Sequence, residues 1–114
     1  MDERIQKWLY DIKIAIEEIE SFFEGEEITF NQYKERRMLK RAVERELEII
    51  GEAMNRIIKY DKSYTDLIED AINIVGLRNQ VIHAYDNISD ENIWAILVKH
   101  IPRLKEDINK VIKE

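Results

Sequence analysis

Apolar residues recur at helical spacing along four segments of the chain, and no stretch keeps the strict alternation of a β-strand. The first apolar stripe follows Asp2, whose side chain can cap a helix. The second begins near Thr29 or Asn31 and runs to about Lys59, and Thr29 and Gln32 have the spacing of a capping box. These patterns predict an all-α fold.

The sequence predicts two further helices in the second half of the chain. A third helix, capped near Ser63 or Thr65, extends through Ile82, and a fourth begins after Ser89. Pro102 lies inside the fourth and predicts a kink, because proline lacks the N–H that an α-helix needs. Short connections place successive helices antiparallel, so we expect an up-down four-helix bundle with the third helix the most irregular.

Composition narrows the class of protein further. The 114 residues predict one domain over 1–114, and the absence of cysteine excludes a disulfide framework or a thiolate zinc site. The longest apolar run, residues 93–98, is far shorter than the roughly 18 residues of a transmembrane helix, so we expect a cytoplasmic protein without membrane contact. Small cores rarely cover such broad apolar stripes, which favours a homodimer.

The chain has two histidines, and the sequence around them differs. His100 has no acid or arginine arranged around it in the sequence, and we interpret it as a surface or boundary histidine. His83 follows Arg78 and Asn79 and precedes Tyr85. Arginine can hold a phosphate, histidine can move a proton near neutral pH, and an amide can orient either group, so this set suits phosphodiester cleavage.

A structural interpretation of the same residues stays open. Arg78 could pair with an acid elsewhere, His83 could cap the end of the helix, and Tyr85 could pack at the end of the bundle. In a straight helix Arg78 and His83 would lie about 140° apart, so spacing alone does not bring them into contact.

Residues 78–85, Arg-Asn-Gln-Val-Ile-His-Ala-Tyr, resemble the Arg-x4-His-x-Tyr motif of the HepT-like toxins in the HEPN superfamily. Residues 41–53 are similar to the second-helix signature of that family, and residues 101–104 to its last-helix pattern. The resemblance implies a HEPN-type helical bundle that dimerises with two motifs near the interface. It also implies a ribonuclease toxin that needs neither metal nor another cofactor, encoded beside a minimal nucleotidyltransferase antitoxin.

The resemblance also implies a role for each motif residue. Arg78 would stabilise the phosphate in the transition state, His83 would act as general base or acid for attack by the 2′-hydroxyl, and Asn79 would orient one of them. Tyr85 would receive AMP from the antitoxin, which neutralises the toxin. Two alternatives remain at this point: a non-catalytic nucleotide- or substrate-binding partner of a nucleotidyltransferase, and a helical adaptor whose motif is structural.

The net charge of −6 argues against nucleic acid as a partner, but its distribution is uneven. Residues 34–45 carry a local charge of +4, and Arg37, Arg41 and Arg45 recur every four residues, which places them on one helix face. This basic ridge could be a solvated face paired with neighbouring glutamates. It could also guide the RNA backbone toward Arg78, with binding that weakens as salt rises.

Overall fold

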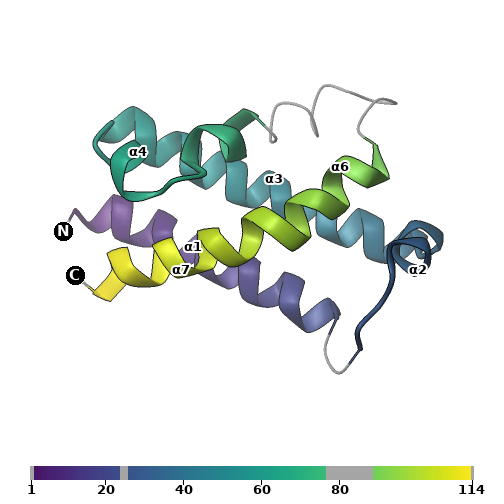
Figure 1. Ribbon diagram of the computed structural model, residues 1–114. Helices are drawn as coiled ribbons and strands as arrows, with labels where there is room; N and C mark the ends of the chain where they lie inside the picture. The colour runs from purple at the N-terminus through teal and green to yellow at the C-terminus, as the bar shows by residue number, and fades with distance from the viewer. Residues whose placement is uncertain (1, 24–25, 77–88, 114) are drawn as a thin grey trace.

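Every described secondary-structure element of the chain is helical. The computed structural model describes residues 2–23, 26–76 and 89–113, and within these ranges there is no strand, as the all-α prediction requires. In chain order the elements are α1 (Glu3–Phe22), α2 (Phe30–Glu35), α3 (Arg37–Tyr60), α4 (Tyr64–Leu67), a helical stretch over 71–76, α6 (Asp90–Ala95), the π-helical turn η1 (Ile96–His100) and α7 (Ile101–Lys113) (Figure 1).

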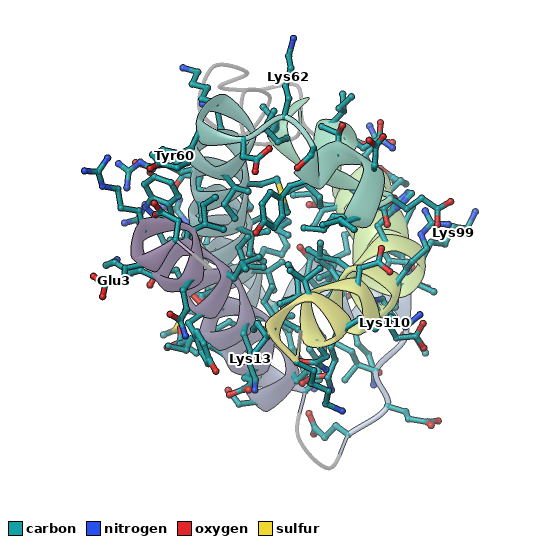
Figure 2. All side chains as sticks on the ribbon, turned by 90° about the vertical axis from the view of Figure 1, so that its left-hand side faces the viewer. Glu3, Lys13, Tyr60, Lys62, Lys99 and Lys110 are labelled. Carbon is teal, nitrogen blue, oxygen red and sulfur yellow. The ribbon has the colours of Figure 1, made fainter. Side chains whose placement is uncertain are left out.

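The long helices α1, α3 and α7 enclose the core. α1 runs antiparallel to α3 and to the continuous rod formed by α6, η1 and α7 (Figure 1). Viewed toward their ends, side chains fill the space between these helices (Figure 2). The buried stripes are those that helical periodicity predicts, and they include Leu9, Ile12 and Ile16 on α1, Leu47, Ile50, Met54 and Ile57 on α3, and Leu104 and Ile108 on α7. None of the described helices is long and apolar enough to span a lipid bilayer.

The start of α1 confirms the predicted cap. The Asp2 carboxylate accepts a hydrogen bond from the backbone N–H of Arg4 at 2.7 Å, which satisfies a group that has no partner inside the helix. The other Asp2 oxygen accepts from the Tyr60 hydroxyl at 2.8 Å. The cap thus also joins the beginning of α1 to the end of α3.

The second predicted helix is divided in two, which corrects the expectation of one continuous element. Its capping box is present: the Thr29 N–H donates to Gln32 Oε1 at 2.9 Å, and the Gln32 N–H donates to Thr29 Oγ1 at 3.2 Å. The helix then breaks at Arg36, whose φ of −93° and ψ of 87° are not helical. The break directs α2 toward α6, so that fully buried Tyr33 packs against Trp94 with ring centroids 5.3 Å apart.

The third predicted helix is the most irregular in its described part, as expected. It forms α4, then leaves helical geometry at Ile68 and resumes over 71–76. The interruption buries Ile68 completely and Asp70 to 1% exposure. The later part of the predicted helix, through Ile82, lies outside the described residues.

The fourth predicted helix begins as expected and deforms near Pro102. Ser89 caps it by accepting a hydrogen bond from the Asn92 N–H at 3.1 Å. Before Pro102 the chain forms the π-helical turn η1, in which the Ile101 N–H donates to the Ile96 carbonyl, five residues back. The irregularity is therefore a π-turn in the residues that lead to the proline, and the predicted kink at Pro102 itself stays a prediction.

A buried acid lies where α1 meets α3. Glu46 is 5% exposed, and its Oε2 atom has no hydrogen-bond partner among the described residues. Burial, together with a hydrogen bond to Glu18, raises the pKa of Glu46 to about 7. Glu46 therefore keeps its proton well above the ordinary pKa of 4.5.

Candidate functional site

The motif predicted to carry the chemistry lies outside the described residues. These positions are Arg78, Asn79, His83 and Tyr85, so the geometry of the four side chains relative to one another stays a prediction. The structure describes the part of the chain that precedes these residues in the sequence. The described part of the helical stretch reaches residue 76, two positions before Arg78 in the sequence.

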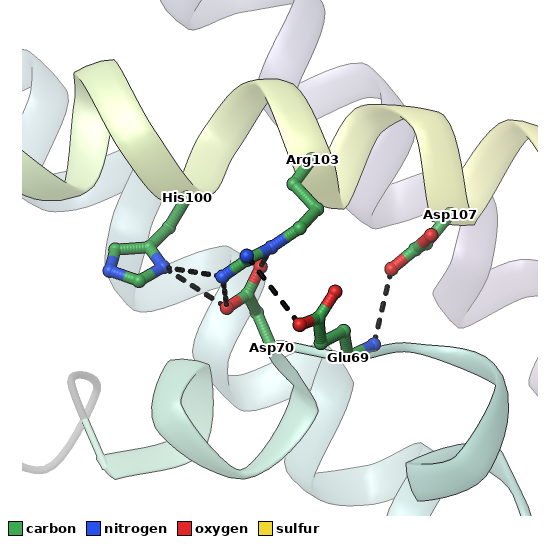
Figure 3. A network of polar contacts seen from close by, with 5 residues as sticks. All are labelled: Glu69, Asp70, His100, Arg103 and Asp107. Atoms are coloured by element: carbon green, nitrogen blue, oxygen red, sulfur yellow. Dashed lines mark hydrogen bonds and ion pairs between the residues drawn. The ribbon is translucent and has the colours of Figure 1, made fainter.

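A polar network holds the chain just before this stretch (Figure 3). Arg103 on α7 donates from Nε to Asp70 Oδ2 at 2.8 Å and from Nη2 to Asp70 Oδ1 at 2.6 Å. His100 Nδ1 lies 3.0 Å from the same Oδ1 atom. Both carboxylate oxygens of the buried Asp70 are therefore satisfied, as a charge removed from water requires.

The neighbouring residue is held by the same helix face. The Glu69 backbone N–H donates to Asp107 Oδ2 at 3.1 Å, and the Glu69 carboxylate lies 3.5 Å from Arg103 Nη1. His100, Arg103 and Asp107 follow one another at intervals of three and four residues, which places them on one side of the helix. Figure 3 shows all three directed toward Glu69 and Asp70.

The network changes the acidity of its members. The Arg103 guanidinium, more than the opposing effect of burial, holds the pKa of Asp70 below its ordinary value of 3.8, and the hydrogen bond with His100 acts in the same direction. The hydrogen bonds with Asp70 correspondingly raise the pKa of Arg103. Asp70 and Arg103 are therefore both charged near neutral pH.

His100 has partners that the sequence analysis did not assign. Its side chain is 32% exposed, as a boundary histidine should be, but Asp70 and Arg103 lie beside it. His100 and Arg103 are three residues apart, which places them close together on one helix. This spacing could have predicted the contact between these two residues. Asp70 comes from 30 residues earlier, so its partnership with His100 depends on the tertiary fold.

The basic ridge of Arg37, Arg41 and Arg45 lies on α3 with all three residues exposed. Arg45 pairs with Glu48 at 3.3 Å, as the interpretation of a solvated, glutamate-paired face expects. Neither Arg37 nor Arg41 forms an ion pair with any residue that the structure describes. Within the described part of the chain, two of the three cations are thus open to a phosphate group.

An apolar groove of about 630 Å³ runs between α1 and the α6–η1–α7 rod. Phe23, Trp94 and Val98 contribute to its lining, and the ion pair between Glu20 and Lys105, at 2.8 Å, lies along it. This lining lacks the cluster of cations that a polyanionic backbone requires. Within residues 2–23, 26–76 and 89–113 no group of three or more acidic, histidine or cysteine side chains is placed to hold a metal ion.

Comparison with known proteins supplies the family context. The model of the family described as "Ribonuclease HepT-like" matches residues 12–111. "Probable ribonuclease HepT" of Thermococcus cleftensis is 35% identical over 106 residues, which cover 93% of this chain and 94% of that protein. "Putative RNase MJ1380" of Methanocaldococcus jannaschii is 32% identical over 112 residues, covering 94% and 95%. No solved structure matches at a comparable level of significance.

Proposed function

The chain belongs to the ribonuclease HepT-like family, and from this premise we propose that it is an endoribonuclease of the HEPN type. The observation that carries the proposal is the Arg-x4-His-x-Tyr motif at residues 78–85, complete and inside the matched range 12–111. The names of the two relatives, both of which cover nearly the whole chain, support the same activity.

The proposed chemistry needs only side chains. His83 removes the proton from the ribose 2′-hydroxyl, and the oxygen attacks the adjacent phosphorus. The bond from phosphorus to the 5′-oxygen of the next nucleotide breaks, and that oxygen takes up a proton from water, which leaves a 2′,3′-cyclic phosphate and a 5′-hydroxyl. Arg78 offsets the negative charge that develops on the phosphate, and Asn79 orients one of these groups. No metal ion or cofactor is required, because the nucleophile is already tethered to the phosphate that it attacks.

Expression in cells tests the activity. Wild type should arrest growth and degrade RNA, and Arg78→Ala and His83→Ala should do neither. Purified wild type should keep its activity in excess EDTA. Failure of wild type to cleave RNA in cells and in vitro would contradict the proposal and favour a non-catalytic nucleotide- or substrate-binding partner of a nucleotidyltransferase.

The second part of the proposal is regulation. The chain acts as the toxin of a toxin–antitoxin pair, and a minimal nucleotidyltransferase neutralises it by transferring AMP to Tyr85. Incubation with that partner and ATP should add the mass of AMP to wild type and not to Tyr85→Phe. Labelling of both proteins would place the modification elsewhere.

The third part is assembly. We expect the segment that carries the motif to complete an antiparallel four-helix bundle and to lie near a homodimer interface. Ile72, 70% exposed, and Leu67, 47% exposed, support this because they leave apolar surface close in sequence to the motif. Sedimentation at micromolar concentration giving a mass near the 13.7 kDa of one chain would contradict the dimer.

A further inference from the structure

The face of the last helix formed by His100, Arg103 and Asp107 fixes the chain at Glu69 and Asp70. The Asp70 carboxylate accepts two hydrogen bonds from the Arg103 guanidinium and contacts His100 Nδ1. The Asp107 carboxylate accepts a hydrogen bond from the Glu69 backbone N–H. With the Glu69–Arg103 ion pair at 3.5 Å, these polar contacts join residues 69–70 to the last helix. They help to fix the position of this short segment.

The residue that is held is also the residue at which a helix begins. The Asp70 carbonyl accepts a hydrogen bond from the Ile74 N–H at 2.9 Å, the first helical bond of the stretch over 71–76. Ala71 and Ile74, which are 1% and 2% exposed, pack this stretch against the core. The direction of the stretch is thus set at its first residue by Arg103 and along its length by apolar contacts.

Few residues just before Asp70 are buried. On α4 Tyr64 packs against the core, while Leu67 at its end is 47% exposed. Between α4 and Asp70, Ile68 is fully buried. The Asp70–Arg103 pair therefore adds a directional polar contact to this apolar packing as the chain approaches the motif.

We propose that Asp70 and Arg103 are positioning residues for the ribonuclease site, because they orient the helical stretch whose chain continues directly into Arg78 and His83. The inference rests on the proposed ribonuclease function. A helix rises about 1.5 Å per residue, so a tilt of about 10° at Asp70 displaces residue 76 by about 1.5 Å. Misplacement of about 1 Å at a reacting centre can lower a rate by about 100-fold.

The test separates positioning from stability. Arg103→Gln removes both the charge and the guanidinium group that binds two oxygens at once. Arg103→Lys keeps the charge but loses the guanidinium group, and Lys105→Gln is the matched control. Lys105 lies on the same helix, forms an ion pair with Glu20 and is 44% exposed, against 41% for Arg103. With all variants held well below their unfolding temperatures, we expect kcat for RNA cleavage to fall at least 10-fold in Arg103→Gln while KM changes less than 2-fold. Arg103→Lys should recover part of kcat, and Lys105→Gln should match wild type.

Amide hydrogen exchange supplies a second readout that does not need activity. Exchange at the Ile74 amide should accelerate at least 10-fold in Arg103→Gln, and exchange at the Ile108 amide should not. Equal kcat in Arg103→Gln and Lys105→Gln would overturn the inference. An inactive wild type would overturn the proposed function, and with it the positioning role of Asp70 and Arg103 in catalysis. Equal exchange of the Ile74 amide in wild type and Arg103→Gln would show that Arg103 does not hold the helical stretch in place.

Discussion

Arg103 binds both carboxylate oxygens of Asp70, at 2.8 and 2.6 Å, across 33 residues of sequence. The pair is asymmetric in its exposure, since the Asp70 side chain is 1% exposed and the Arg103 side chain 41%. Loss of Asp70 leaves a cation that water can reach, whereas loss of Arg103 leaves a buried anion. We therefore expect substitution of Arg103 and substitution of Asp70 to lower the stability of the protein by different amounts.

Arg103→Met should destabilise the protein more than Asp70→Asn does. We expect a loss of about 1–2 kcal/mol in the free energy of unfolding for Asp70→Asn and a larger loss for Arg103→Met, because a buried charge that has lost its ion-pair partner is the costlier defect. Urea unfolding at pH 7 measures both values. Lys105→Met is the control for loss of a partly exposed cation, and a larger loss in Asp70→Asn than in Arg103→Met would contradict the argument.

Stability should fall in acid through Asp70. Its pKa is lower in the folded protein than the ordinary 3.8, so the native state binds the proton less tightly than the unfolded chain does. The contribution is present above pH 3.8 and is lost as the pH falls through the lower, folded value. Asp70→Asn should therefore show a shallower decline than wild type in urea unfolding below pH 4, and parallel curves would show that the pair adds nothing.

Glu46 should act in the opposite direction. Its pKa of about 7 in the folded protein lies above the ordinary 4.5, so stability falls as the pH rises from about 4.5 to about 7. Glu46→Gln keeps the shape without the charge and should raise stability at pH 8 by roughly 2 kcal/mol, with little change at pH 4. Urea unfolding at both pH values measures this. Glu52→Gln, at a more exposed site on α3, should change neither, and an equal gain at pH 4 and 8 would rule out the titration of Glu46 as the cause.

Tyr33→Phe should be neutral or stabilising. The Tyr33 hydroxyl is buried without a hydrogen-bond partner among the described residues, while its ring packs against Trp94. Removing the hydroxyl removes a desolvation cost of about 1 kcal/mol and keeps the aromatic contact. Tyr60→Phe provides the contrast in a thermal melt: it loses the hydrogen bond to Asp2 and should lower the melting temperature. A lower melting temperature for Tyr33→Phe would indicate that the hydroxyl has a partner.

The basic ridge should contribute to RNA affinity if it meets the backbone. Arg37→Gln combined with Arg41→Gln should weaken binding of single-stranded RNA and reduce the slope of log affinity against log salt by about 1–2. Filter binding from low to moderate salt measures the slope. Arg56→Gln is the control, because Arg56 lies on the same helix and pairs with Glu52 at 2.7 Å. If the slope for the double variant equals the slope for Arg56→Gln, the basic ridge has no role in RNA binding.

Local signals in the sequence predicted three helix starts, whereas the Ser63 side chain makes no capping hydrogen bond at the start of α4. Asp2, Ser89 and the Thr29–Gln32 pair each cap a helix as expected, because a cap involves residues only two or three positions apart. The buried stripes follow from periodicity for the same reason. Neither signal needs knowledge of the rest of the fold.

Interactions across the fold were not predictable in this way. The break at Arg36 lets Tyr33 reach Trp94, and the break near Ile68 buries Asp70 beside Arg103. Each outcome depends on partners that are distant in the sequence, and these outweigh the propensity to continue a helix. The motif residues Arg78, Asn79, His83 and Tyr85 were found from the family resemblance, and their arrangement still depends on that resemblance.

The π-turn η1 amounts to a one-residue insertion that the last helix has absorbed. Because each residue advances a helix by about 100°, the extra residue changes the phase of α6 relative to α7 by that angle. Trp94 lies before the turn and meets Tyr33, while Arg103 lies after it and meets Asp70. Without the turn, the same residues in a regular helix would satisfy either α2 or Asp70, but not both. A deletion at Val98, which is 56% exposed, would remove the extra residue, so that a regular α-helix would bring Trp94 and Arg103 to the same two partners.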